Sequence, residues 1–149
     1  MSTPEYVSRE EVRKVCEELG ISDWSVRTGT DVPEEEARII FEKVDSPGMG
    51  INLDEFQKGL QIELEHGTMF EDANITNNHP LLTGKIVIAH FKEMLDYYLR
   101  LEVAEIQGDI FKALLAGDAQ KIAAKQRKLI QARLELAQWE KKLLEKAGK

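Results

Sequence analysis

The chain has 149 residues, 42% of them hydrophobic, and a net charge of −7, which is enough for one ordinary domain with its own core. The negative charge argues against general nucleic-acid binding, and no apolar run approaches the roughly 20 residues of a membrane span. A single cysteine, Cys16, and an N-terminus without a signal-peptide pattern predict a cytoplasmic protein.

Three helices are predicted in the first 67 residues. The first begins after Ser8, a candidate N-cap, and ends at Gly20, where a left-handed residue is favoured. Cys16 lies on its apolar stripe and is interpreted as a packed small hydrophobe. A second helix follows Pro33, and a third begins after Asn52, another candidate cap, and ends at Gly67.

The turn between the second and third helices resembles an EF-hand, because two glycines precede the sequence INLDEF. A calcium loop needs oxygen ligands at positions 1, 3 and 5 and a bidentate acid at position 12. Placing Glu55 at position 12 puts Val44 at position 1 and Gly48 at position 5. Placing Asp45 at position 1 puts Phe56 at position 12. Neither register supplies the ligands, so we predict an EF-hand-like corner that binds no calcium.

The rest of the chain is predicted as a loop over residues 68–84 and a helical hairpin over residues 85–149. Its first arm is one long helix, with an interruption at Gly108, and a tight turn at Gly117 leads into the last helix. No strand-like alternation occurs. The predicted fold is therefore an all-α helical bundle in a single domain, with an EF-hand-like helix–turn–helix part in residues 1–67.

The last helix carries an apolar residue every seven positions, with further apolar positions beside them: Ile122, Leu129, Leu136 and Leu143, then Ala123, Ile130, Ala137 and Leu144. A sustained heptad predicts packing along another long helix. Residues 85–115 of the same chain are the favoured partner because a short connection joins them; the same helix of a second subunit is the alternative. Residues 118–149 contain 9 Lys/Arg and 4 Asp/Glu, which gives a net charge of +5. The first 117 residues contain 11 Lys/Arg and 23 Asp/Glu, which gives a net charge of −12.

Two pairs of side chains have the spacing of a metal site. Glu63 and His66 share one helix face, and His90 and Glu93 share another. Glu-x-x-His motifs on facing helices hold metals in ferritin-like bundles, although here one motif is reversed. The four residues predict a site for one Fe, Mn or Zn ion, with Tyr97 or Tyr98 nearby.

A purely structural interpretation of the same residues is also open. Glu63 would then be a solvated helix acid, and His66 would interact with the negative end of the helix dipole. His90 would form a hydrogen bond with a neighbour such as Tyr97 or a carboxylate.

The segment from GLQIELEHG to YYLRL resembles a family of small uncharacterised proteins of bacteria, archaea and phages. The matching positions are Glu63, Glu65, His66, Pro80, Lys85, Ile86, His90, Glu93, Asp96, Tyr97, Tyr98 and Leu101. The resemblance implies no activity, but it does imply that the two Glu/His pairs belong to one module. Met94-Leu95 replaces a residue-Pro pair of the family, which predicts a less kinked helix there.

Two functions from different classes follow. The first is a transition-metal-binding helical protein, acting through Glu63, His66, His90 and Glu93. The second is a non-enzymatic interaction or structural accessory protein, for example of a phage or another larger particle, that acts through the C-terminal helix by binding a protein partner or forming a homo-oligomer. Neither a phosphate-binding loop nor a nucleophile motif occurs, so whether the chain is an enzyme stays open.

Overall fold

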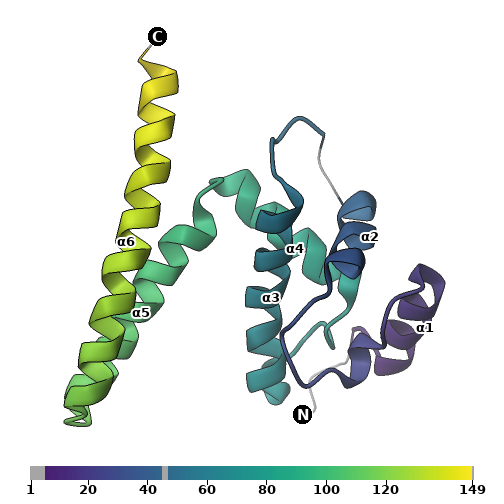
Figure 1. The fold of residues 1–149 in the computed structure, drawn as a ribbon. Helices are drawn as coiled ribbons and strands as arrows, with labels where there is room; N and C mark the ends of the chain where they lie inside the picture. The colour runs from purple at the N-terminus through teal and green to yellow at the C-terminus, as the bar shows by residue number, and fades with distance from the viewer. Residues whose placement is uncertain (1–5, 45–46, 149) are drawn as a thin grey trace. The chain divides into compact units, whose positions relative to one another are not determined.

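The computed structural model describes residues 6–44 and 47–148, and within those ranges it contains helices and turns but no strand (Figure 1). The α-helices are α1 (Arg9–Leu19), α2 (Glu34–Val44), α3 (Leu53–Met69), α4 (Pro80–Glu93), α5 (Tyr97–Leu115) and α6 (Ala119–Ala147), and short 3-10 helices lie at η1 (Trp24–Val26) and η2 (Glu71–Ala73). The all-α prediction is confirmed. None of these helices has the length and apolar character needed to span a bilayer.

The chain divides into two compact units, Met1–Leu95 and Asp96–Lys149, and each is described by itself. The first unit holds α1 to α4, and the second is the hairpin of α5 and α6. The predicted boundary at residue 85 therefore falls inside the first unit, within α4.

Both predicted ends of α1 and the predicted start of α3 are confirmed by their caps. The Ser8 hydroxyl accepts a hydrogen bond from the Glu11 backbone N–H at 3.2 Å, and Gly20 ends α1 with φ of 70°. Asn52 and Glu55 form a reciprocal capping box at the start of α3. Each cap satisfies backbone groups that a helix end leaves without partners.

The turn between α2 and α3 contains two glycines in left-handed conformation, Gly48 with φ of 88° and Gly50 with φ of 73°. Glu55, the one acid at a candidate calcium position that the structure describes, is engaged in the capping box. Asp45, the other candidate, lies outside the described residues, and calcium binding here stays untested.

The core of the first unit is formed by one apolar stripe from each helix: Val12, Cys16, Ala37, Ile40, Phe56, Leu60, Leu64, Val87, Ile88 and Phe91. Cys16 is 1% exposed, which confirms its role as a packed residue. Gly84 lets α4 approach the other helices closely. A methyl group there would lie 2.9 Å from Ile40 and 3.3 Å from Phe56.

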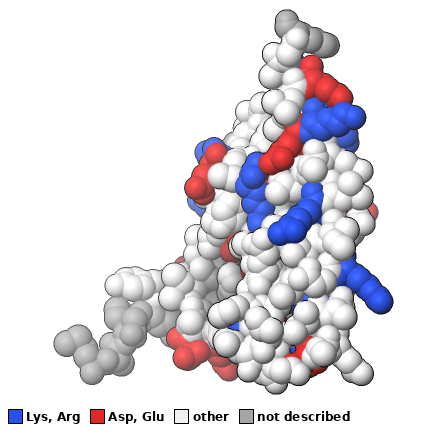
Figure 2. Space-filling model, turned by 90° about the vertical axis from the view of Figure 1, so that its left-hand side faces the viewer, with Lys and Arg blue, Asp and Glu red and all other residues white. Residues whose placement is uncertain are grey.

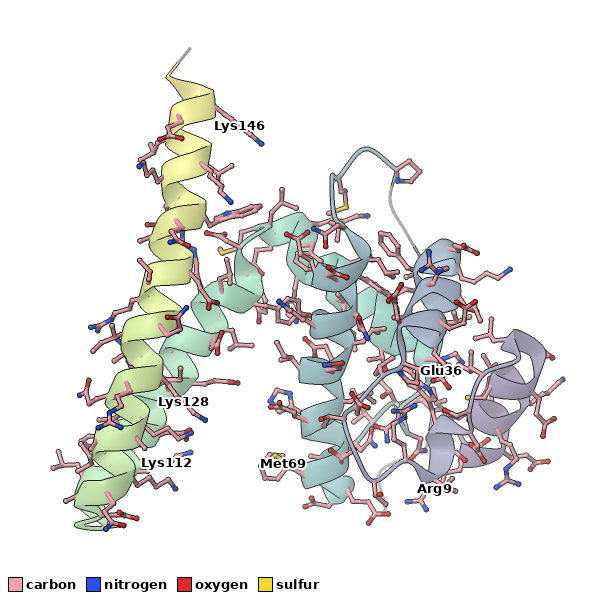
Figure 3. The ribbon with its side chains drawn as sticks, viewed as in Figure 1. Arg9, Glu36, Met69, Lys112, Lys128 and Lys146 are labelled. Atoms are coloured by element: carbon pink, nitrogen blue, oxygen red, sulfur yellow. The ribbon has the colours of Figure 1, made fainter. Side chains whose placement is uncertain are left out.

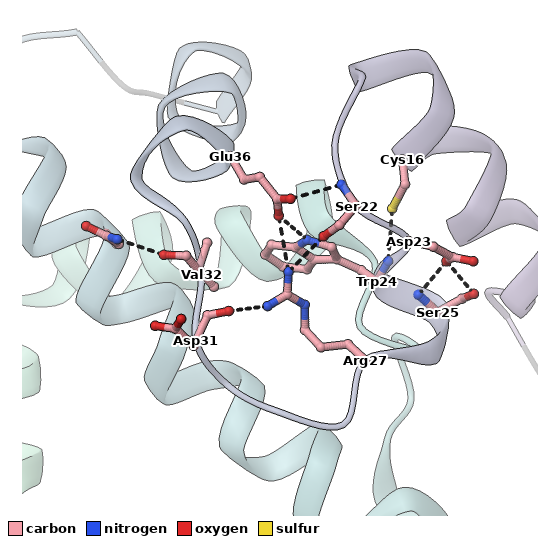
Figure 4. Close-up of polar contacts among 10 residues, drawn as sticks. Cys16, Ser22, Asp23, Trp24, Ser25, Arg27, Asp31, Val32 and Glu36 are labelled. Atoms are coloured by element: carbon pink, nitrogen blue, oxygen red, sulfur yellow. Dashed lines mark hydrogen bonds and ion pairs between the residues drawn. The ribbon is translucent and has the colours of Figure 1, made fainter.

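A polar cluster around Trp24 connects η1 to α2 (Figure 4). The buried Trp24 indole donates a hydrogen bond to Glu36 at 2.9 Å, and the Arg27 guanidinium stacks on the ring and pairs with Glu36 at 3.1 Å. Burial alone would raise the pKa of Glu36, but hydrogen bonds from Trp24 and Ser22 and the charge of Arg27 outweigh it and lower that pKa.

The prediction that Gly67 ends α3 is wrong, because the helix continues to Met69. The glycine serves close packing instead. A methyl group on Gly67 would overlap Asn78 Oδ1, and Asn74 donates hydrogen bonds to the Gly67 carbonyl at 3.2 Å and to Asn78 Oδ1 at 2.9 Å. Two asparagine side chains therefore occupy the space that a side chain at position 67 would need.

The predicted loop over residues 68–84 is wrong at both ends, since the irregular segment covers only residues 70–79. His79 begins α4 as an unexpected N-cap, with Nδ1 accepting from the Leu82 N–H at 3.3 Å, and Pro80 occupies the first turn. Burial lowers the pKa of His79, which favours the neutral imidazole that this bond requires.

The single helix predicted over residues 85–115 is also wrong. The chain breaks at residues 94–96, where Met94 is extended with φ of −159°, and it continues through Gly108 without interruption. The less kinked helix expected from Met94-Leu95 does not form. Asp96 precedes α5 and accepts a hydrogen bond from Arg100 at 2.7 Å, while α4 and α5 pack within different units. Packing here overrides the continuous helical pattern.

The hairpin of α5 and α6 confirms the favoured intramolecular pairing of the last helix. Asp109 pairs with Lys125 at 2.5 Å and Arg100 with Glu140 at 2.9 Å, so the two helices run antiparallel. Between them lies a small core of Ile106, Leu129 and Ala132, with Val103 and Ile110 packed against it.

Candidate functional site

The structure brings together one residue from each predicted pair. His90 Nε2 on α4 lies 3.3 Å from Glu63 Oε1 on α3, and the two side chains are 28% and 14% exposed. This contact confirms that the two motifs belong to one module and provides the predicted link between a histidine and a carboxylate on different helices. A partly buried pair of this kind ties α3 to α4.

The outer members of the two pairs, His66 and Glu93, are exposed. Each lies three residues from its partner, about one helical turn along its own helix. His66 and Glu63 also line an open cavity of about 120 Å³, together with Thr83 and Ile86. Across the parts of the chain that the structure describes, no three His, Cys, Asp or Glu side chains gather closely enough to hold a metal.

The tyrosines expected near the site belong to the second unit. Tyr97 and Tyr98 begin α5 and contact each other edge to face, with ring centroids 5.1 Å apart.

Sequence reasoning missed a group of asparagines between α3 and α4. Asn77 and Asn78 have left-handed backbones with φ of 47° and 60°, and Asn77 Nδ2 donates to the Val7 carbonyl at 2.5 Å. They line a polar cavity of about 200 Å³, across which Arg9 pairs with Glu71. The available cue was the pair Asn77-Asn78, since asparagine tolerates this backbone better than most residues.

The hairpin leaves a second set of apolar side chains uncovered. On α5, Phe111 and Leu114 are each 60% exposed, and on α6 Ile130 is 67% and Leu144 is 73% exposed. At about 100° per residue, Phe111 falls on the same side of α5 as Arg100, and Leu144 falls beside Glu140 on α6.

The ion pair between Arg100 and Glu140 therefore marks the side of the hairpin on which the exposed apolar residues lie. We define the apolar face of the hairpin as Phe111, Leu114, Ile130, Ala137 and Leu144.

Two basic residues border this face at Ile130 on α6. Arg127 and Arg133 lie three residues before and after Ile130, one on each flank. Within the described ranges neither has an ion-pair partner, whereas the nearby acids Glu140 and Glu145 are paired with Arg100 and Lys141.

In Figure 2 some Lys and Arg side chains lie beside Asp and Glu in the upper part of the view, and others lie among uncharged residues. Lys112, Lys128 and Lys146 project from the hairpin (Figure 3).

Searches of curated proteins and of solved structures returned no significant match. A family model matches residues 12–107, about two thirds of the chain. The matched segment runs from α1 into α5 and contains Glu63, His66, His90 and Glu93, while α6 lies outside it. The chain belongs to the family described as Protein of unknown function (DUF5661).

Proposed function

We propose that this protein is a non-enzymatic interaction protein that binds a helical partner along the apolar face of the hairpin. The observation that carries the proposal is the exposure of Phe111, Leu114, Ile130 and Leu144 on one side of two paired helices. Large apolar residues gathered on one surface are typical of interaction sites.

The small core of the hairpin supports this proposal. Its described buried hydrophobic residues are Tyr98, Ile106, Ala113, Leu129 and Ala132. A pair of amphipathic helices buries only one stripe of each, and helical bundles gain stability when further helices cover the rest. Ile130, Ala137 and Leu144 recur every seven residues, a spacing that suits a long helix better than a strand.

A designed probe tests the proposal. The probe is a fluorescent helical peptide of about four heptads with Leu at the a and d positions and uncharged Gln on the flanks. We expect the full-length chain to raise its anisotropy, and Ile130→Glu to weaken binding at least tenfold. Ala124→Glu is the matched control, because it adds the same charge at an exposed position about 120° around α6 from Ile130, outside the apolar face. Equal binding by both variants would overturn the proposal.

A second candidate, transition-metal binding, is favoured by the contact between Glu63 and His90. Two ligand types for Fe, Mn or Zn already lie 3.3 Å apart, and His66 shares a cavity wall with Glu63. Movement of His66 would supply a third ligand. Elemental analysis of the purified chain, with His90→Ala as the comparison, tests this candidate. A metal content that stays below stoichiometric after loading and desalting would end it.

A further inference from the structure

We infer that the partner of the apolar face is an amphipathic helix whose flanks carry acidic residues. The inference rests on the proposed function and adds the chemistry of the partner. It is drawn from the charges that border the face, since heptad spacing alone suits helices of any charge.

The border of the face on α6 is basic. Arg127 and Arg133 each lie about 60° around α6 from Ile130, whereas Lys121, Lys125 and Lys128 lie about 140–180° from it, on the other side of the helix. Lys125 pairs with Asp109 across the hairpin. Arg127 and Arg133, the residues on either side of Ile130, have no ion-pair partner in the described part of the chain.

The acids of α5 are on the other side of the hairpin. With Ile106 and Ile110 facing α6, a rotation of about 100° per residue places Glu102, Glu105 and Asp109 on the side opposite Phe111. Around Ile130 the apolar face is therefore bordered by two arginines without ion-pair partners in the described part of the chain, whereas the acids near Leu144, Glu140 and Glu145, are already paired with Arg100 and Lys141.

This segregation disfavours a second copy of the chain as the partner. Two copies joined with their Ile130 side chains in contact would bring Arg127 and Arg133 of one chain near the same residues of the other. Like charges at heptad flanks oppose pairing, whereas opposite charges favour it and select the partner. A helix with Glu or Asp on both flanks of its apolar stripe would supply the missing charge.

An anionic membrane is the other surface that a basic amphipathic helix can bind. The net charge of −7 on the chain opposes adsorption to such a surface, and the heptad spacing of the face has no role in it. An acidic helix fits both the charge at the border of the face and its heptad spacing.

The test compares two versions of the probe peptide, with Glu or Lys in place of the flanking Gln. We expect the full-length chain to bind the Glu probe at least tenfold more tightly than the Lys probe at low salt. The difference should shrink as salt is raised toward about 1 M, where the screening length is about 3 Å. Arg127→Glu combined with Arg133→Glu should reverse the preference, because the charge that borders the face then changes sign.

The outcomes separate the two proposals. Loss of all probe binding, or binding that Ile130→Glu leaves unchanged, overturns the proposed function. Binding of the Glu and Lys probes with equal affinity overturns the inference about charge alone. Two further results would also overturn the inference about charge. A dimer in sedimentation equilibrium that Ile130→Glu dissociates would make a second copy the partner. Cosedimentation with vesicles of anionic but not zwitterionic lipid would make a membrane the partner.

Discussion

Replacing Gly67 with alanine tests the close contact between α3 and the asparagines that follow it. At an exposed position inside a helix, this change stabilises a protein by about 1 kcal/mol, because alanine has the higher helix propensity. At position 67 the new methyl group would overlap Asn78 Oδ1 and lie 3.0 Å from Asn74 Nδ2. The substitution therefore has two opposing effects on the free energy of unfolding.

The steric effect should be the larger one. Asn78 is 6% exposed and has a left-handed backbone, so its side chain has little room to move away. Overpacking costs about 1–3 kcal/mol. Disturbing the hydrogen bond from Asn74 to Asn78 costs about 1 kcal/mol more, which offsets the gain in helix propensity. We expect Gly67→Ala to destabilise the protein by about 1–3 kcal/mol.

Urea denaturation followed by circular dichroism measures this change, and Gly108→Ala is the control. Gly108 also lies inside a helix, but nothing is within 4 Å of the position of its added methyl group, so this variant should be more stable by up to about 1 kcal/mol. In an Asn78→Gly background the cost of Gly67→Ala should largely disappear. The reasoning is refuted if Gly67→Ala stabilises the protein as Gly108→Ala does.

Two further predictions concern titratable groups, and a third concerns calcium. The folded state lowers the pKa of His79 below its ordinary 6.5, so the stability of the fold should fall as pH drops below that value. His79→Asn keeps a capping side chain, and in thermal melts this variant should lose the dependence of stability on pH in that range. Because the folded state lowers the pKa of Glu36, its carboxylate stabilises the fold above its ordinary pKa of 4.5, and this contribution is lost as pH falls further. Glu36→Gln should lower the free energy of unfolding by about 1–3 kcal/mol at neutral pH and should weaken the loss of stability at acid pH. Millimolar calcium should leave the melting temperature unchanged, and a rise that Glu55→Gln abolishes would show that the turn binds the ion.

The sequence predicts those parts of the fold that depend on neighbouring residues. The caps at Ser8, Gly20 and Asn52 are local features, because each satisfies backbone groups within a few positions. The role of Gly67 and the break at residues 94–96 depend on contacts with distant segments. The glycine faces asparagines from the next connection, and the break separates helices that pack in different units.

The candidate sites show the same division. The spacing of the two Glu/His pairs predicted which side chains share a helix face, and the structure places one residue of each pair, Glu63 and His90, in contact. The spacing could not determine whether His66 and Glu93 join them, because that depends on how far one helix is displaced along the other. The heptad of α6 predicted the stripe that packs on α5, but not that Ile130 and Leu144 would stay exposed beside it.

The contacts around Trp24 have a consequence for the order of folding. Its hydrogen bonds with Cys16 and Glu36 join residues 8 and 12 positions away, whereas the bond from Asn77 to Val7 closes a loop of 70 residues. Closing a longer loop costs more chain entropy and slows formation of the contact. The Trp24 cluster can therefore form while α3 and α4 are still unfolded, and amide hydrogens of α1 should gain protection in refolding before those of the segment around Asn77.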